Sequence, residues 1–453
     1  MDIVSLIRQR AKEQPHQPAL RIEDSDETLT YSELVRRAEN CSTQLFERGC
    51  RPEERCGLIV ANPKEFLVSA LGILASGLCI APMGTFLPEE EKDYAIKAAG
   101  LHWLLEANQR LIRMPFATAV DDADDKAFRG CSPAYVRFTS GSTGRRKGVL
   151  LGHQTILNRL NAANEVLRIT PKDKIWFALP MADHFVVSIL LYLSRGATVV
   201  ISESSTGWET TARLGQPTIL YGAPEYYQEL TRSDVESLDS VRLAISTTAP
   251  LLPQTATDFS VRFRKNLNPA LGIIEVGLLT LNTDAHKSGS VGAAMPAYKV
   301  TLVGEDGRVV ETGETGELHV SGPGLFDAYL APWRPLRALV RDNGFPTGDF
   351  ARQDKDGYLY LLGRGKNRLQ VDGLQFFCEE VETALNTLPG IRESRVFVDP
   401  DSRKLAAEVV GPVDKTDRLE RLLLEQFDAR KVPRIFRVVD RLPRTPNGKI
   451  RRE

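Results

Sequence analysis

Short apolar runs alternate with amphipathic stretches along most of the chain, and this alternation limits the possible fold more than any other feature. The runs 56–62 (CGLIVAN), 174–180 (KIWFALP) and 217–222 (PTILYG) are rich in aliphatic and aromatic residues and end in Asn, Pro or Gly, which is typical of buried strands. Between such runs, segments 64–77 and 153–167 place apolar residues at the spacing of an amphipathic helix. We therefore expect an α/β fold of parallel sheets with helices on both faces.

The pattern changes from about residue 289, where strands and turns replace the helical spacing. Segment 298–322 alternates polar and apolar residues around the turn sequences EDG and TGE, which predicts β-hairpins. We expect a β-rich subdomain at about 289–363 that completes a large N-terminal domain, residues 1–363.

The sequence pattern of residues 364–453 differs from that of the preceding domain and indicates a separate unit. Two amphipathic segments, 378–388 and 418–430, lie on either side of two strand-like runs, which predicts a small α+β domain. Residues 418–452 hold eleven Lys and Arg against four Asp and Glu. This basic tail is either a solvated helix face or a docking surface for an acidic or phosphorylated partner.

The composition excludes several classes of protein. The chain has 453 residues, enough for two or three domains, and its 58 Lys and Arg balance 59 Asp and Glu, which argues against a nucleic-acid-binding protein by bulk charge. No apolar run reaches the roughly 18 residues that span a membrane, and the first residues lack the apolar core of a signal peptide. The six cysteines form no CxxC pair, which favours reduced thiols over disulfides or zinc. We therefore expect a cytoplasmic enzyme.

The densest chemical signal lies in residues 135–148, YVRFTSGSTGRRKG. Glycines allow close approach of the backbone, and successive N–H groups, hydroxyls and an ammonium group suit a polyphosphate. The spacing is not that of a Walker A loop, because glycine rather than Ser or Thr follows the lysine. The alternative is a flexible Ser/Gly surface loop. The candidate phosphate contacts are Thr139, Ser140, Gly141, Ser142, Thr143, Gly144 and Lys147.

This loop resembles the phosphate-binding signature of the adenylate-forming enzymes, which include acyl- and aryl-CoA ligases, peptide-synthetase adenylation domains and luciferases. Segments 29–34 (LTYSEL), 346–373 and 444–452 (RTPNGKIRR) resemble further motifs of that family in the same order, so the resemblance covers nearly the whole chain. It implies a large α/β domain followed by a small mobile lid domain, with the hinge near Lys366.

The resemblance also implies roles for individual residues. Asp349 would accept hydrogen bonds from both ribose hydroxyls, for which an acceptor-only carboxylate is suited, and Arg364 would be a second nucleotide contact. Lys449 would bridge the ribose, the substrate carboxylate and the α-phosphate, where its charge offsets the charge that builds on phosphorus. Lys147 would act beside the phosphates. The alternatives are a turn Asp before a strand and an ordinary tail lysine.

Residues 271–277 (LGIIEVG) resemble the family's aromatic-Gly-x-Thr-Glu segment. Gly272 would then lie against ATP, and Glu275 would help to hold Mg²⁺, a cation that combines few carboxylates with phosphate oxygens. Leu271 replaces the ring that stacks on adenine, and Ile274 replaces a hydroxyl that contacts the α-phosphate. We therefore expect adenine stacking to be weaker or to come from elsewhere in the chain, with an effect on the rate of adenylation. The alternative is a buried Glu in an apolar strand, which would need a partner.

The acid-binding pocket is expected around residues 180–185 (PMADHF), with two alternatives. His184 as a pocket wall would favour an aryl or fatty acid, and we prefer this interpretation. Asp183 facing inward would favour an amine-bearing acid, as in a stand-alone amino-acid adenylation enzyme. Gly222 is expected to border the same cavity. Thr247 and Thr248 replace the family's usual glycine pair, which narrows the pocket or offers hydroxyls to a polar ring substituent.

Together these residues imply a two-step ligase. The acid attacks the α-phosphate of Mg²⁺·ATP to give an acyl-adenylate, and after rotation of the lid the acyl group passes to the thiol of CoA or of a carrier protein's phosphopantetheine. Gly373 would line the thiol tunnel, and the basic tail favours an acidic carrier protein as partner. Rival interpretations are a luciferase-like oxygenase and a non-catalytic adenylate-binding relative, the latter suggested by Leu271 and Ile274. We expect no nucleic-acid partner and no membrane span.

Overall fold

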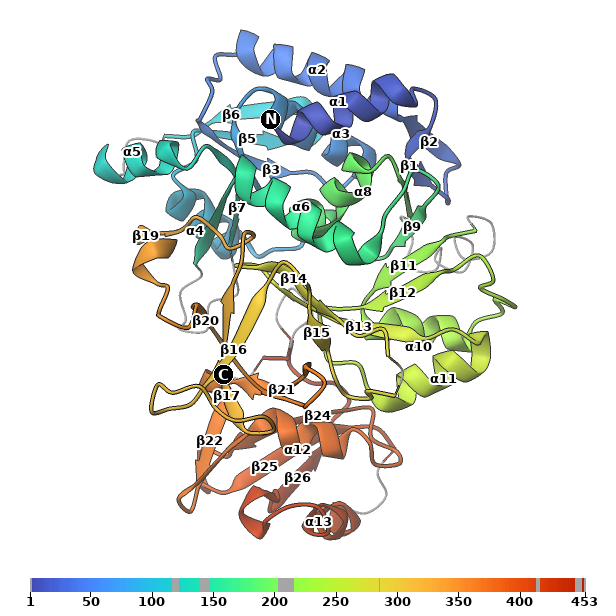
Figure 1. The fold of residues 1–453 in the computed structure, drawn as a ribbon, viewed down its shortest axis with the longest axis vertical. Coiled ribbons are helices and arrows are strands. Elements are labelled where there is room, and N and C mark those ends of the chain that lie inside the picture. Colours follow the sequence, from blue (N-terminus) through green and yellow to red (C-terminus); the bar gives the residue numbers. More distant parts are fainter. Residues whose placement is uncertain are drawn as a thin grey trace.

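A computed structural model of the chain describes residues 2–115, 122–138, 147–202, 216–284, 286–412, 416–444 and 450–451. Figure 1 shows three tiers from top to bottom: an N-terminal sheet with its helices, a second sheet, and a C-terminal unit. Within the described residues the strands form sheets of eight, thirteen, three and two strands. The predicted α/β class is therefore confirmed.

The first sheet has a parallel centre and antiparallel edges. Strands β7, β4, β3 and β5 pair in parallel, whereas β8, β18 and β19 continue one edge and β6 the other in antiparallel pairing. The strand order is β19 (Arg334–Pro335), β18 (Ala328–Leu330), β8 (Gly148–Gly152), β7 (Pro133–Phe138), β4 (Cys79–Pro82), β3 (Arg55–Ile59), β5 (Trp103–Glu106) and β6 (Arg110–Arg113).

The second sheet joins a parallel half to an antiparallel half. Strands β13, β12, β11, β9, β10 and β1 run parallel, and antiparallel pairing begins at β13–β14. The antiparallel part therefore starts before residue 289, earlier than the predicted subdomain, and it extends the parallel sheet. The strand order is β16 (Lys299–Val303), β17 (Thr315–Ser321), β20 (Phe345–Gln353), β21 (Tyr358–Arg364), β15 (Gly292–Ala294), β14 (Gly277–Leu281), β13 (Leu267–Ile273), β12 (Leu243–Ser246), β11 (Ile219–Gly222), β9 (Lys174–Phe177), β10 (Thr198–Ile201), β1 (Pro18–Ile22) and β2 (Glu27–Thr30).

Helices cover both sheets, and the helices predicted at 64–77 and 153–167 are confirmed as α3 and α6. Asn62 caps α3 by accepting a hydrogen bond from the Glu65 N–H at 2.9 Å, and proline follows the cap, as is typical of a helix start. Helix α6 contacts β8 of one sheet and β14 of the other, so it joins the two sheets. The helices of the large unit are α1 (Ile3–Glu13), α2 (Tyr31–Glu47), α3 (Pro63–Ala75), α4 (Glu89–Ala99), α5 (Asp122–Gly130), α6 (His153–Leu167), α7 (Met181–His184), α8 (Leu190–Ser194), α10 (Pro224–Arg232) and α11 (Pro253–Phe263).

The LTYSEL segment has a structural role. Thr30 and Glu33 form a capping box that begins α2, in which each side chain accepts a hydrogen bond from the other residue's backbone N–H. The buried hydroxyl of Tyr31 donates to the carbonyl of Ala197, at 2.7 Å, and lies 3.1 Å from that of Leu193. This segment therefore ties the N-terminal helices to the region of α8 and β10.

The C-terminal unit has its own sheets and its own hydrophobic core. The predicted helix at 378–388 is confirmed as α12 (Cys378–Leu385), but α13 (Thr416–Leu424) ends before the predicted residue 430. The reason is that the Asp428 carboxylate accepts the Arg430 N–H and starts a separate short turn there. The strands are β22 (Arg368–Val371) with β23 (Leu374–Phe377), and β24 (Glu393–Val398), β25 (Leu405–Val410) and β26 (Ile435–Val438).

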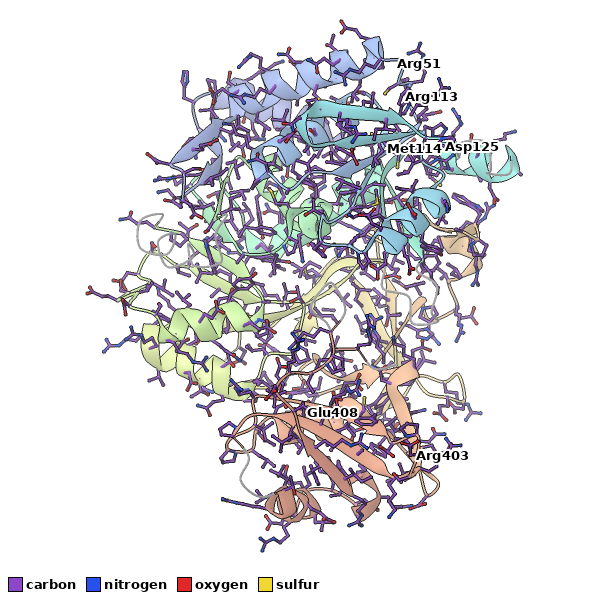
Figure 2. All side chains as sticks on the ribbon, turned by 180° about the vertical axis from the view of Figure 1, so that it is seen from behind. Arg51, Arg113, Met114, Asp125, Arg403 and Glu408 are labelled. Carbon is purple, nitrogen blue, oxygen red and sulfur yellow. The ribbon has the colours of Figure 1, made fainter. Side chains whose placement is uncertain are left out.

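The first sheet and the C-terminal unit lie at opposite ends of the molecule, as the labels of Asp125 and of Arg403 and Glu408 show in Figure 2. An ion pair stabilises each end: Asp125 pairs with buried Arg55 at 2.9 Å, and Glu408 pairs with Arg395 at 3.2 Å. All six cysteines are free thiols. Among the helices of the described residues, none has the length and apolar character needed to cross a membrane.

Candidate active site

The carboxyl ends of four neighbouring parallel strands, β9, β11, β12 and β13, meet at one edge of the second sheet. Ligands bind at this edge in open α/β sheets. Hydrogen bonds join the turns that follow the strands: the Ala178 N–H donates to the Tyr221 carbonyl and the Thr247 N–H to the Gly222 carbonyl, both at 3.1 Å. The topology therefore brings together predicted residues that are far apart in sequence: Asp183, His184, Gly222, Thr247, Thr248, Gly272 and Glu275.

Aromatic rings form one side of this edge. The rings of Phe177 and Tyr221 are nearly parallel, with centroids 5.6 Å apart, and the His184 ring stands edge-on to both at 6.0 and 6.1 Å. The hydroxyls of Ser188 and Thr247 hydrogen-bond to the buried Tyr221 hydroxyl. Burial raises the pKa of Tyr221, so this hydroxyl stays neutral. The His184 region is thus a wall of flat rings with a small network of hydroxyls.

Asp183, at the same wall, forms an ion pair with an arginine. Its carboxylate lies 3.1 Å from the guanidinium of Arg137, which also donates to the Asp183 carbonyl, and each of the two side chains is 22% exposed. Arg137 was not predicted as a site residue, and no sequence motif pointed to it. Because the negative charge of Asp183 is matched inside the protein, this carboxylate is poorly suited to bind a substrate amine.

A π-helical turn, η2 (Phe185–Ile189), follows α7 directly. A π turn adds one residue to a helix and is frequent at functional sites. This turn was not predicted from the sequence.

The two threonines that replace a glycine pair lie in different environments. Thr247 is buried and hydrogen-bonds Tyr221, whereas Thr248 is exposed and has a φ of 76°. A β-branched residue in this left-handed region is strained, and glycine is the residue that adopts it without cost. The backbone conformation at position 248 is therefore one that favours glycine.

Glu275 and Lys147 contact the same tyrosine. The Tyr329 hydroxyl donates to Oε1 of Glu275 at 2.8 Å, and the Lys147 ammonium lies 4.8 Å from the centroid of the Tyr329 ring. Burial, followed by the charge of Glu275, raises the pKa of Tyr329, so the hydroxyl keeps its proton. Tyr329 lies on β18 and was not predicted as a site residue. The structure thus brings the predicted Lys147 and Glu275 to one cluster.

A buried arginine holds the backbone beside Glu275. Arg159 of α6 donates to the Gly324 carbonyl at 2.6 Å and to the Ile274 carbonyl at 2.9 Å, and burial lowers the pKa of this guanidinium to about 10. The side chains of Leu271 and Ile274 pack against the main hydrophobic core. The two departures from the family pattern therefore add apolar contacts within the protein.

Asp349 and Arg364 face each other on paired strands. They are direct partners in the β20–β21 register, and the Arg364 Nε donates to the Asp349 carboxylate at 2.9 Å. The turn before Asp349 is fixed because the Gly348 N–H donates to Glu317 at 3.2 Å and the Thr347 hydroxyl donates to the Leu318 carbonyl at 2.8 Å. The two predicted nucleotide residues therefore form one charged pair.

The donor set of this site fits a cation that is carried mainly by phosphate. Among the described residues, no three His, Cys, Asp or Glu side chains converge as a metal cage would require. Glu275 offers a single half-buried carboxylate, and Mg²⁺ is usually bound by one or two carboxylates together with substrate phosphates.

Several predicted residues lie outside the described residues: Thr139, Ser140, Gly141, Ser142, Thr143, Gly144 and Lys449. The chain on both sides of each group is defined. Phe138 and Gly148 are paired at the ends of β7 and β8, and Arg444 forms an antiparallel bridge with Ile450.

Lys366 and Gly373 lie beyond β21, where the chain enters the C-terminal unit. Lys366 is in the short turn η4 (Gly365–Asn367). Asp372 and Gly373, with φ of 46° and 79°, form the two-residue turn of the β22–β23 hairpin, a turn that favours Asp-Gly. A Cβ at Gly373 would meet no atom within 4 Å, so Gly373 is an open hairpin tip and is not packed against the nucleotide residues.

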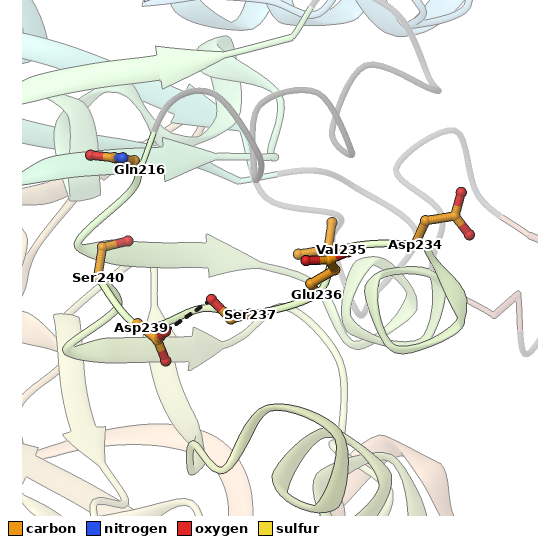
Figure 3. Close-up of a pocket in the computed structure, with 7 residues that line it drawn as sticks. All are labelled: Gln216, Asp234, Val235, Glu236, Ser237, Asp239 and Ser240. Atoms are coloured by element: carbon orange, nitrogen blue, oxygen red, sulfur yellow. Dashed lines mark hydrogen bonds between the residues drawn. The ribbon is translucent and has the colours of Figure 1, made fainter.

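A separate hollow lies at the opposite edge of the same strands. Figure 3 shows this cavity of about 680 Å³, beside the segments that enter β11 and β12. Three of its side chains are acidic, which does not suit a polyphosphate. Because it lies at the amino ends of the strands, it is not the site described above. It is lined by Gln216, Asp234, Val235, Glu236, Ser237, Asp239 and Ser240.

The sequence matches two family models that together cover most of the chain. Residues 7–330 match the family described as AMP-binding enzyme, and residues 380–449 match the AMP-binding enzyme C-terminal domain.

Relatives of two kinds are similar to nearly all of the chain. It is 29% identical to a feruloyl-CoA synthase from an Amycolatopsis species, over 97% of this chain and 96% of that protein. It is 26% identical to a linear gramicidin synthase from Brevibacillus parabrevis, over 99% of this chain but only 6% of that protein. Among solved structures, ATP-bound MatB from Rhodopseudomonas palustris superposes with a TM-score of 0.85 and 26% identity, over 99% of this chain and 97% of that one.

Proposed function

The chain belongs to the AMP-binding enzyme family and is an AMP-forming acid–thiol ligase that uses ATP and Mg²⁺, and we propose that its acid is an aryl carboxylic acid and that its thiol acceptor is CoA. The observation that carries the choice of acid is the ring wall of Phe177, Tyr221 and His184 beside the charge-matched Asp183. A fatty acid is the second candidate.

The ring wall supports an aryl acid for a geometric reason. Aromatic rings pack favourably in offset-stacked and edge-to-face pairs, and Phe177, Tyr221 and His184 already use both arrangements with one another. A planar acid adds one more ring to such a set, whereas a flexible alkyl chain loses rotamer freedom and gains no ring contact. The Thr247 hydroxyl lies beside this wall and suits a polar substituent on the ring.

The pairing of Asp183 argues against an amino acid as substrate. An amine-binding carboxylate must be free to accept the ammonium group, but Asp183 already pairs with Arg137 at 3.1 Å. A substrate amine would therefore have to compete for the carboxylate with the Arg137 guanidinium, which is also held by the Asp183 carbonyl.

The acceptor is proposed from the length of the relatives and from the charges of the basic tail. The feruloyl-CoA synthase is matched at 29% identity over 96% of its length, whereas the gramicidin synthase is matched at 26% identity over 6% of its length. The basic tail is also less available than its composition implies, because five of its eleven cations form ion pairs within the described residues. The paired cations are Arg430 with Asp428, Lys431 with Glu380, Arg434 with Glu420, Arg437 with Asp399 and Arg444 with Glu393. A carrier protein is therefore the second candidate.

In the first half-reaction, an oxygen of the acid attacks the α-phosphorus of ATP, the bond from that phosphorus to the bridging oxygen breaks, and pyrophosphate leaves. We assign the ribose to Asp349 and Arg364, and the phosphates to the 139–147 loop. Mg²⁺ held partly by Glu275 would offset the charge of the leaving pyrophosphate. Lys449 would stabilise the charge on the α-phosphate, so this step is one of positioning and electrostatics.

In the second half-reaction, the thiol sulfur attacks the carbonyl of the mixed anhydride, AMP leaves with the bonding electron pair, and the thiol proton passes to solvent. We propose that the C-terminal unit, residues 364–453, rotates about Lys366 between the two steps. Rotation would withdraw Lys449 and bring the Gly373 hairpin tip, which is open in the described orientation, towards the thiol path.

The test is acid-dependent exchange of labelled pyrophosphate into ATP over a panel of benzoates, hydroxybenzoates, cinnamates, fatty acids and amino acids. We expect exchange with aryl acids, and then thioester formation with CoA in preference to a phosphopantetheine-loaded carrier protein. Exchange with amino acids alone would overturn the choice of acid. Thioester formation with the carrier protein alone would overturn the choice of acceptor.

A further inference from the structure

We propose that Tyr329 is a positioning residue that keeps Lys147 and Glu275 apart as separate charges, so that both remain available to Mg²⁺·ATP. The inference rests on the proposed roles of Lys147 and Glu275. It adds a residue that neither the motifs nor the comparisons assign.

Two opposite charges from different sheets meet at this point. Lys147 precedes β8 of the first sheet, and Glu275 lies between β13 and β14 of the second. A direct pair between these two side chains would be strongly attracted, because the effective dielectric constant near a protein surface is lower than that of water. Such a pair would match both charges internally, and bound ATP would then have to separate them.

The structure shows a different arrangement. Among the described residues, Lys147 and Glu275 form no ion pair with each other, and both contact Tyr329. The ammonium faces the electron-rich ring at 4.8 Å, whereas the carboxylate accepts the hydroxyl proton at 2.8 Å. A tyrosine is suited to this task because one side chain offers a π face for a cation and a donor for an anion.

Tyr329 is held rigidly enough to act as a spacer. It pairs with Val149 in the β18–β8 register, and its ring lies 4.5 Å from that of Phe326. The side chain is buried, with the residue 7% exposed. Because β18 and β8 are adjacent strands, the ring is fixed beside the end of β8, where Lys147 lies.

The Glu275 end is fixed by the same segment of chain. The Phe326 N–H donates to the Glu275 carbonyl at 2.8 Å, and Arg159 joins the carbonyls of Ile274 and Gly324. The second carboxylate oxygen, Oε2, accepts no hydrogen bond from the described part of the chain. The hydroxyl of Tyr329 therefore occupies one oxygen, and the other would be available to a hard cation.

The experiment compares Tyr329→Phe, Tyr329→Leu and Glu275→Gln with a matched control, Tyr298→Phe. Tyr298 is also buried, and its hydroxyl donates to the backbone of the same segment, at the Val276 carbonyl, 3.1 Å away. Binding is measured as the loss of the free-Mn²⁺ EPR signal in the presence of α,β-methylene-ATP, which cannot react. Pyrophosphate exchange and thermal unfolding are measured in parallel on the full chain.

We expect Tyr329→Phe to weaken Mn²⁺ binding in the presence of the analogue by about tenfold, because the carboxylate loses its donor while the ring still faces Lys147. Tyr329→Leu should also weaken binding of the analogue itself, because the direct Lys147–Glu275 pair then forms. Tyr298→Phe should leave both affinities within about twofold, and thiolysis of supplied acyl-adenylate should be unchanged in this control variant.

The outcomes separate this inference from the proposed function. If Glu275→Gln leaves Mn²⁺ binding unchanged, the metal role of Glu275 is wrong. If Glu275→Gln weakens binding but Tyr329→Phe does not, the role of Tyr329 is wrong. Equal losses in Tyr329→Phe and Tyr298→Phe would show general loosening of the segment and would also overturn the inference.

Discussion

The proposed nucleotide side and the proposed acid side of the site differ in the chemical groups that form them. On the proposed nucleotide side, carboxylates are held by direct hydrogen bonds, as in the Asp349–Arg364 pair at 2.9 Å and the bond from the neutral Tyr329 hydroxyl to Glu275 at 2.8 Å. On the proposed acid side, the wall consists of rings and hydroxyls, and the opposite charges of Asp183 and Arg137 are paired with each other. The proposed site thus combines two modes of recognition.

The difference matters because the two modes discriminate by different amounts. A site that hydrogen-bonds its ligand rejects an imperfect one strongly, since buried polar groups are left unpaired, whereas an apolar pocket distinguishes one methylene by only about 1–3 kcal/mol. Variants on the nucleotide side should therefore abolish function, and variants on the acid side should change the choice of substrate.

Lys449→Ala tests the nucleotide side most severely. Loss of a charge that stabilises the α-phosphate should slow adenylate formation by at least about 10²- to 10³-fold. Thiol transfer from a supplied acyl-adenylate should persist, because Lys449 is proposed to act only in the first step. Rapid-quench assays of each half-reaction measure the two rates. Equal loss of both would contradict the rotation of the C-terminal unit.

Asp349→Ala is expected to have the next largest effect. It removes the proposed acceptor of two ribose hydroxyls and leaves Arg364 without its 2.9 Å partner, so the KM for ATP should rise by about 30- to 500-fold. The KM for the acid should change little. Steady-state kinetics with each substrate varied in turn measures both values. Asp354→Ala is the matched control, because Asp354 pairs with Lys287 at 2.8 Å at the far end of β20 and should not affect ATP. An unchanged KM for ATP in Asp349→Ala would refute the ribose assignment.

Two glycine substitutions on the acid side should have opposite effects on stability. Thr248→Gly removes a strained left-handed threonine and should raise the free energy of unfolding by about 0.5–1 kcal/mol. Thr247→Gly removes the hydroxyl that bonds Tyr221 and should lower it by about 1–2 kcal/mol. Urea denaturation measures both. Both variants should also accept bulkier ring substituents, with a rise in kcat/KM of less than about tenfold.

Asp183→Asn should have the smallest effect. The Asp183–Arg137 pair is partly exposed, so its loss should cost at most about 1 kcal/mol and change kcat/KM for an aryl acid by less than about tenfold. The acid panel, repeated with this variant, measures the change. Activity of the wild-type protein with an amino acid that disappears in Asp183→Asn would show that the carboxylate binds an amine, and the comparison between the two sides would fail.

The sequence by itself determined the class of fold and the positions of several helices and strands, among them α3, α6 and α12, and it indicated the candidate nucleotide residues. These features are local. A strand or helix is marked by the period of its own side chains, and the turn at 347–349, to which we assign the ribose, is a run of adjacent residues in which Gly348 adopts a φ of 78°.

Only the tertiary structure decided which distant residues meet. Arg137 reaches Asp183 across the two sheets, Tyr329 reaches Glu275 from β18, and Arg159 crosses from α6 to two backbone carbonyls. The π turn at 185–189 and the internal ion pairs of the basic tail also became known only from the tertiary structure. Such contacts depend on strand register and on the packing of one sheet against another. No period or short motif carries that information, because a side chain's partner is set by the whole arrangement of elements around it.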